Sequence, residues 1–143
     1  MTTTPTPSET TQTSIASLRL VTARDRKPMT GRAPAGIRSL GRRNAVIILK
    51  SPFIDGMHVL MDVHNTTPKL LEVFFPGENP ETHQDLSLLG NIDSYRREED
   101  QQGVRFVLEI VWLADGTAPV LQDKDLKRLV RLLKKDPQSF GAH

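Results

Sequence analysis

Two histidines and an aspartate are the residues whose types come closest to a metal site or a proton-transfer site. His58, Asp62 and His64 lie in a stretch of alternating apolar and polar residues, so all three would point to one face of a strand. Along an extended strand, however, the two histidines lie about 20 Å apart, too far to share one ion. We interpret these side chains as a solvated strand face.

Other catalytic arrangements are not indicated. The carboxylates of Glu98, Glu99 and Asp100 fall in a charged stretch typical of a hydrated loop, and no serine or threonine stands in a nucleophile-elbow pattern. The chain contains no cysteine, which excludes a thiolate nucleophile, a disulfide and a Cys-rich zinc site. We therefore expect a protein that is not an enzyme and that needs no metal or other cofactor.

Charge is strongly segregated along the chain. Residues 16–50 carry nine basic groups and one acid, whereas residues 51–123 carry four basic groups and thirteen acids. Such a basic segment can bind a polyanion, or it can lie on the acidic surface of its own protein. The spacing of the basic residues favours the second interpretation. The candidate polyanion-binding residues are Arg24, Arg26, Lys27, Arg32, Arg38, Arg42 and Arg43.

Length and composition indicate one soluble domain. The chain has 143 residues, of which 37% are hydrophobic and only 5% aromatic, so the core should be aliphatic. Residues 1–14 are rich in Thr, Ser and Pro and are predicted to be a disordered tail, and residues 137–143 are predicted to be a C-terminal tail. No signal-peptide pattern or membrane-spanning run is present, so we expect a cytoplasmic protein that does not bind membranes.

Period-two patterns predict about seven strands. They fall at residues 15–20, on both sides of a turn within 37–50, at 57–64, at 69–75, at 88–92 and at 103–113. Residues 21–36 are predicted to be an exposed loop, and residues 93–102 a charged connection. In the last strand Val104, Phe106, Leu108, Ile110 and Trp112 share one face. Asp115 and Gly116 then predict a hairpin turn, although Pro119 lacks the N–H that a paired strand donates.

Only one segment has helical periodicity. In residues 122–136 Leu126, Leu129, Val130 and Leu133 recur at helical spacing, with Asp123 as the expected N-cap. The helix should end before Pro137. The predicted fold is therefore mainly β, an antiparallel sandwich of about seven strands over residues 15–121 followed by one amphipathic helix.

An ordered series of short motifs resembles one known family. "PGEN" at residues 76–79, "LSLLGNI" at 86–92 and "GVRFVLEIVWLADGT" at 103–117 resemble, in order, blocks of the β-sandwich substrate-binding domain of Hsp70 chaperones. "MHVLMDVHNTTPKLLEVFFPGE" and "SLGRRNAVI" are similar to further elements of that domain, and "LQDKDLKRLVRLLKK" is similar to the start of its lid. The ATPase domain, most of the lid and at least one strand have no counterpart in this chain.

The resemblance implies a peptide-binding groove. In the family an extended apolar peptide threads between loops at one end of the sandwich, and one side chain fills an apolar pocket. The matching positions here are Leu60, Val63, Leu70 and Glu72. A buried carboxylate at Glu72 would be costly, so either the register slips by one, placing Leu71 and Val73 inside, or the pocket is lost.

Two functions remain open. The leading hypothesis is a non-enzymatic module that holds an extended apolar peptide or a specific protein partner. The alternative is a structural or nucleic-acid-associated accessory protein that uses the basic 19–43 segment, although no aromatic residues are interleaved there for base stacking. The pattern indicates neither the partner nor an oligomeric state.

Overall fold

The computed structural model describes residues 15–49, 68–77, 85–101, 103–116, 119–136 and 139. These residues form six strands and one helix. Their bounds are β1 Ala16–Thr22, β2 Ala33–Leu40, β3 Asn44–Leu49, β4 Lys69–Phe75, β5 Leu86–Asp100, β6 Gly103–Trp112 and α2 Asp123–Leu133. The mainly β class with a C-terminal helix is thus confirmed. Among the described residues, no helix is long and apolar enough to cross a membrane.

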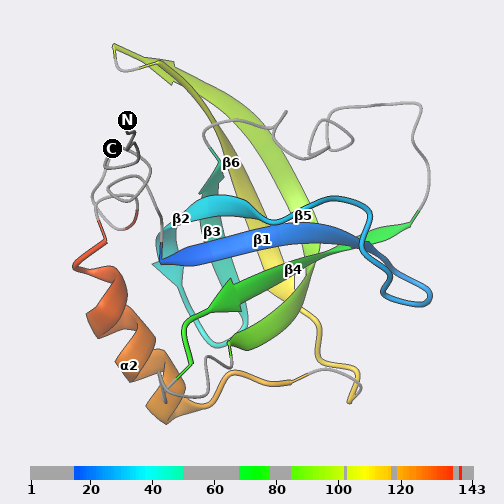
Figure 1. Ribbon diagram of the computed structural model, residues 1–143. Helices are drawn as coiled ribbons and strands as arrows, with labels where there is room; N and C mark the ends of the chain where they lie inside the picture. Colours follow the sequence, from blue (N-terminus) through cyan, green and yellow to red (C-terminus); the bar gives the residue numbers. More distant parts are fainter. Residues whose placement is uncertain are drawn as a thin grey trace, which may run out of the picture.

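The six strands close into an antiparallel barrel in the order β1-β2-β3-β6-β5-β4 (Figure 1). Closure is made by β1 and β4, which pair over six positions from Ser17↔Phe74 to Thr22↔Lys69. The predicted sandwich of about seven strands is therefore corrected to a barrel for the described residues. A sandwich leaves strands at the edges of two sheets, whereas here each of the six strands has a partner on both sides.

Small side chains on the inner face suit so narrow a barrel. Ala16, Ala33, Ala35 and Ala45 are all buried in the main core, together with larger aliphatic residues from every strand. Alternation of small and large inward residues allows a small barrel to be filled without a central channel. The predicted aliphatic core is confirmed, and β6 supplies the predicted face of Phe106, Leu108, Ile110 and Trp112.

On β4 the inward residues are Leu71, Val73 and Phe75, each fully buried. Leu70 and Glu72 consequently face outward, because successive side chains of a strand alternate between its two faces. Leu71 and Val73 therefore lie inside the barrel, whereas their place in a peptide pocket stays a prediction.

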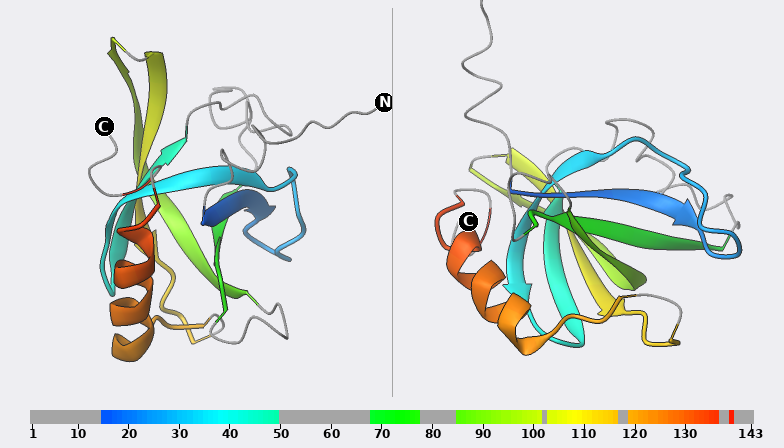
Figure 2. Two further views of the ribbon diagram at one scale, coloured as in Figure 1. Left: turned by 60° about the vertical axis from the view of Figure 1, so that its left-hand side comes forward. Right: turned by 60° about the horizontal axis from the view of Figure 1, so that its bottom comes forward.

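Strands β5 and β6 form the longest hairpin and extend beyond the barrel wall (Figures 1 and 2). β5 runs without interruption through residues 93–100, so the predicted charged connection is wrong. Its register shifts between Ile92 and Ser94, a bulge that lets the strand bend away from the barrel. β3 pairs with β6 only as far as Phe106, so no third described strand pairs with the tip, where the side chains of residues 93–99 and 103–105 are exposed or partly exposed. Charged residues are therefore tolerated there.

The hairpin predicted at Asp115 and Gly116 is also wrong. Gly116 does adopt the expected left-handed conformation, with φ of 84°. Residues 119–122 form no strand, however, and the chain passes directly into α2. Pro119 could not have donated a ladder hydrogen bond, which is consistent with this outcome.

Helix α2 lies beside β2 and completes the core (Figure 2). Leu129 and Leu133 are fully buried and join the main hydrophobic cluster, as does Leu121 just before the helix. The predicted N-cap is displaced by one residue: Gln122 occupies that position, without a side-chain hydrogen bond, and Asp123 begins the helix.

A buried polar contact fastens the chain after α2 to the barrel. The Ser139 hydroxyl accepts a hydrogen bond from the Ile37 N–H at 2.8 Å and donates one to the Asp136 carboxylate at 2.9 Å. That carboxylate also accepts a hydrogen bond from the Ile15 N–H at 3.3 Å. Ser139 is 1% exposed, so residues 137–143, predicted to be a tail, contain at least one residue that belongs to the core.

We expect Ser139→Ala to destabilise the protein by about 1–3 kcal/mol, because the buried Ile37 N–H would lose its acceptor. Urea unfolding measures the change. Ser94→Ala, at an exposed strand position, is the matched control and should leave the midpoint unchanged. Equal midpoints for the two variants would contradict a structural role for the Ser139 contact.

Candidate functional site

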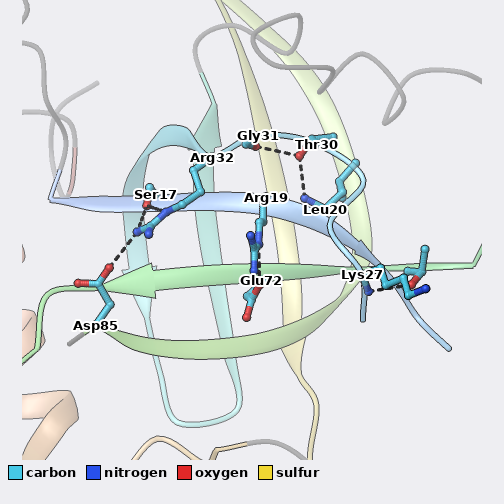
Figure 3. Close-up of polar contacts among 10 residues, drawn as sticks. Ser17, Arg19, Leu20, Lys27, Thr30, Gly31, Arg32, Glu72 and Asp85 are labelled. Atoms are coloured by element: carbon cyan, nitrogen blue, oxygen red, sulfur yellow. Dashed lines mark hydrogen bonds and ion pairs between the residues drawn. The ribbon is translucent and has the colours of Figure 1, made fainter. Parts of the chain in front are cut away.

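Where the structure describes the residues singled out by resemblance, they lie on the outer face of β4. Leu60 and Val63 lie outside the described residues, as do His58, Asp62 and His64. Leu70 is 5% exposed and packs with Val21 and Leu89 in a small cluster outside the barrel. Glu72 accepts a hydrogen bond from the Arg19 guanidinium at 2.8 Å (Figure 3). The described members of the predicted peptide site are therefore held by neighbours of their own barrel.

Two guanidinium groups lie over the aromatic ring of Phe74, two residues after Glu72 on β4. The Cζ atoms of Arg32 and Arg19 lie 3.8 Å and 5.2 Å from the centroid of the Phe74 ring. Arg32 also donates to the Ser17 hydroxyl and to Asp85, at 2.8 Å and 3.0 Å (Figure 3). Cation–π contacts at such exposed sites contribute about 0.5–1 kcal/mol each. This cluster fixes β1 to β4 at the seam where the barrel closes.

The basic segment lies largely on the protein's own acidic residues. Five of the nine basic groups in residues 16–50 form ion pairs with acids from residues 51–123, the interpretation that the spacing favoured. The pairs are Arg19–Glu72, Arg26–Asp115, Arg32–Asp85, Arg38–Glu98 and Arg42–Asp123. Lys27 pairs with Asp25, while Arg24 and Arg43 are exposed. The seven candidate polyanion-binding residues are thus spread over several ion pairs and do not form one free patch.

Glu98 is the centre of the densest of these networks. Arg38, Arg96 and Arg105 lie 3.1, 3.2 and 3.5 Å from its carboxylate, and Arg96 also reaches Glu109 at 2.7 Å. The hydrogen bond from Arg38 is the main reason that the pKa of Glu98 is lowered from its usual value. A lowered folded-state pKa means that the ionised carboxylate stabilises the fold above the unfolded-state pKa. This stabilisation is lost as pH falls through the folded-state pKa.

Glu98→Gln should therefore lower the urea midpoint at pH 7. It should also reduce the further loss of folding stability that the wild type shows below about pH 4. Urea unfolding at several pH values measures both effects. Glu99→Gln, a change of the same kind at an exposed residue on β5 that pairs with the exposed Arg97, is the control and should lower the midpoint at pH 7 less than Glu98→Gln does. A Glu98→Gln protein with the same pH dependence as the wild type would show that the arginines do not stabilise the charged form.

A groove lies where β6 ends, and we call it the β6-end groove. It is lined by Arg42 and Arg43 of the β2–β3 turn, by residues 111–114 and by residues 119–121. Its volume is about 490 Å³. The segment after β6 passes near the β2–β3 turn on its way to α2 (Figure 1), and residues 119–121 of this segment line the groove.

Trp112, the only tryptophan of the chain, forms part of the lining of this groove. Its main-chain N–H donates to the Arg43 carbonyl at 2.8 Å, and its indole Nε1–H donates to the Gly41 carbonyl at 3.1 Å. The indole is 8% exposed, so little of it meets solvent. These two bonds fix the β2–β3 turn, and with it both arginines, against the end of β6.

The groove wall is apolar and its rim is basic. Val111 and Val120 are 45% and 55% exposed, and Leu121 beside them is buried. Arg42 pairs with Asp123 at 3.3 Å, but both side chains are more than half exposed, so this pair is weak. The Arg43 guanidinium has no ion-pair partner among the described residues. An apolar ligand with a carboxylate matches both features.

Sequence reasoning identified the residues of this groove only in part. Trp112 was placed on the inward face, and Arg42 and Arg43 were named as candidate anion-binding residues. The groove itself arises because residues 119–121 pass the β2–β3 turn, a tertiary contact with no periodic signal. The available clue was Pro119, which lacks the N–H that a paired strand donates.

Neither a metal nor a family relationship adds to these observations. Among the described residues no group of three or more His, Cys, Asp or Glu side chains is placed to hold a metal ion. Comparisons of the chain with protein-family models, curated proteins and solved structures give no match. The relationship to the Hsp70 substrate-binding domain therefore stays a prediction.

Gly90 on β5 allows the close packing beneath Trp112. A Cβ atom at this position would lie 2.7 Å from Ile110 Cγ2 and 3.3 Å from Trp112 Cε3. We expect Gly90→Ala to destabilise the protein by about 1–3 kcal/mol and to alter the tryptophan emission, because the indole must shift. Chemical unfolding followed by Trp112 fluorescence measures both. Asn91→Ala, at the exposed neighbouring position, is the control, and equal effects in the two variants would contradict this account.

Proposed function

We propose that this protein is a non-enzymatic binding module that holds an extended apolar segment of a protein partner in the β6-end groove. One observation carries the proposal. The described residues include three exposed large hydrophobic side chains, Tyr95, Val111 and Val120, and two of them line this one groove. Exposed apolar side chains that gather in a concavity are typical of a binding site.

The chemistry of the lining supports binding rather than catalysis. None of the nine lining residues is a nucleophile, and none can act as a general base at neutral pH. The only charged groups are the guanidinium groups of Arg42 and Arg43, which recognise carboxylates through paired N–H donors. The preferred ligand is thus an apolar segment with an acidic side chain or a free C-terminal carboxylate.

The resemblance to the Hsp70 substrate-binding domain supports the same class of ligand but a different location. It implied a pocket containing Leu70, which here packs in the small cluster outside the barrel. Leu113 contacts that cluster and also lines the β6-end groove. The outer face of β4 is therefore continuous with the groove through one side chain.

The alternative function, nucleic-acid association through the basic 19–43 segment, is less well supported. Ion pairs with the protein's own acids would have to open before those arginines could contact phosphates. Each such exchange removes much of the electrostatic gain that drives phosphate binding.

Trp112 provides a built-in reporter for the proposal. A fluorescein-labelled heptapeptide of leucine and valine with a C-terminal glutamate should bind the full chain at tens of micromolar and change the Trp112 emission. Val120→Asp should weaken this binding at least tenfold. The new carboxylate would lie on the apolar wall, where the apolar side chains of the peptide bind, and it would also repel the carboxylate of the peptide. Fluorescence polarisation measures the affinity.

The matched control is Tyr95→Asp, which changes the third exposed hydrophobic residue, located on β5 outside the groove lining. It should bind the peptide as the wild type does. The proposal is wrong if folded wild-type protein does not bind the peptide, or if the Val120→Asp and Tyr95→Asp variants bind it equally well.

A further inference from the structure

Helix α2 has one apolar face, whose edge stays partly accessible. Leu129 and Leu133 point into the barrel core and are fully buried. Leu126 packs against this core but is only partly buried, and Val130 beside it is also partly buried. Both line a shallow hollow on the molecular surface, so the edge of the apolar face remains partly accessible.

Three cations border this hollow. Lys127, Arg131 and Lys134, which we call the basic ridge, line it together with Leu126 and Val130. Their spacing along the helix is four and three residues, so they follow one side of α2 over about 10 Å. An apolar strip thus runs beside a strip of positive charge.

The three cations of the basic ridge line the same hollow, and none of them pairs with a described acid. Among the described residues, Lys127, Arg131 and Lys134 form no ion pair. The acids of α2 lie in its first turn, and Asp125 is within 3.9 Å of Arg128, which also donates to the Pro76 carbonyl. The basic residues of 16–50, by contrast, are mostly paired. The basic ridge is therefore a group of three neighbouring cations without an ion pair to a described acid, whereas among the described members of the 16–50 segment only Arg24 and Arg43 form none.

We propose that this face of α2 is a second docking surface, which binds an acidic amphipathic helix of a partner protein. The partner's leucine-like side chains would occupy the hollow between Leu126 and Val130, which are about 6 Å apart along the helix axis. Its flanking carboxylates would contact the basic ridge. Helix-on-helix recognition by apolar residues at this spacing with charged flanks is a common binding mode.

Other anionic partners fit the same face less well. Phosphates of a nucleic acid would contact the ridge but would leave the apolar hollow unused. A membrane-bound helix needs a broad apolar face to insert among the lipids, and here Leu129 and Leu133 are already committed to the core. An acidic protein helix uses both the apolar strip and the charges.

The test is fluorescence anisotropy of a labelled synthetic helix, with leucine at helical spacing and glutamate elsewhere, titrated with the full chain. We expect binding that weakens with added salt. The double variant Lys127→Glu/Arg131→Glu should weaken it at least tenfold. Lys124→Glu/Lys135→Glu makes the same change in net charge at exposed lysines that do not line the hollow, and should bind within about twofold of wild type.

Further measurements separate this surface from the β6-end groove and from other anions. Val130→Asn, checked for folding by circular dichroism, should also weaken binding, whereas Val120→Asp should not. The proposal is overturned if the ridge and control variants weaken binding equally, because the attraction would then be diffuse. It is also overturned if a DNA duplex or phosphatidylserine vesicles bind through the ridge while the acidic helix does not.

Discussion

The pairing of β1 with β4 turns a sheet into a barrel, and most other features follow from that closure. It brings Ser17 opposite Phe74 and Arg19 opposite Glu72, so the seam carries an ion pair and two guanidinium groups over one aromatic ring. Closure also limits the space inside. A six-stranded barrel accepts large side chains only where alanine or glycine faces them, and Gly90 beneath Trp112 is one such position.

Closure also explains where the remaining binding surfaces can lie. Within the closed wall each strand has a partner on both sides, so another protein cannot be added there as a further strand. Apart from Tyr95 on β5, the accessible apolar side chains discussed above lie at the end of β6, in the segment that follows it and on α2. That segment and α2 form the connection that leaves the barrel and returns to fill its core with Leu121, Leu129 and Leu133. The segment that completes the fold thus supplies the surfaces proposed to bind partners.

Strand periodicity allowed much of this fold to be predicted, but not the closure. The alternation of Phe106, Leu108, Ile110 and Trp112 identified an inward face, since burial on one side imposes a period of two. The pairing of β1 with β4 joins residues about fifty positions apart and leaves no local signal. The charged stretch 93–100 was not predicted as a strand because it lies in a hairpin tip beyond the barrel. The side chains of residues 93–99 are exposed or partly exposed there, so no buried face imposes an alternation of apolar and polar residues.

For the candidate sites, the same distinction between local and long-range information applies. The segregation of charge was visible in the sequence. It favoured ion pairs between the basic residues of 16–50 and the acidic residues of 51–123, because both segments belong to one short chain. Which cations stay unpaired was not visible: Arg38 meets Glu98 across sixty residues, whereas the basic ridge on α2 meets none of the described acids. Helical spacing identified Leu126 and Val130 as apolar positions but could not distinguish them from Leu129 and Leu133. Only the packing of α2 on the barrel decides that Leu129 and Leu133 are fully buried, while Leu126, at the edge of the core, and Val130 keep part of their surface exposed.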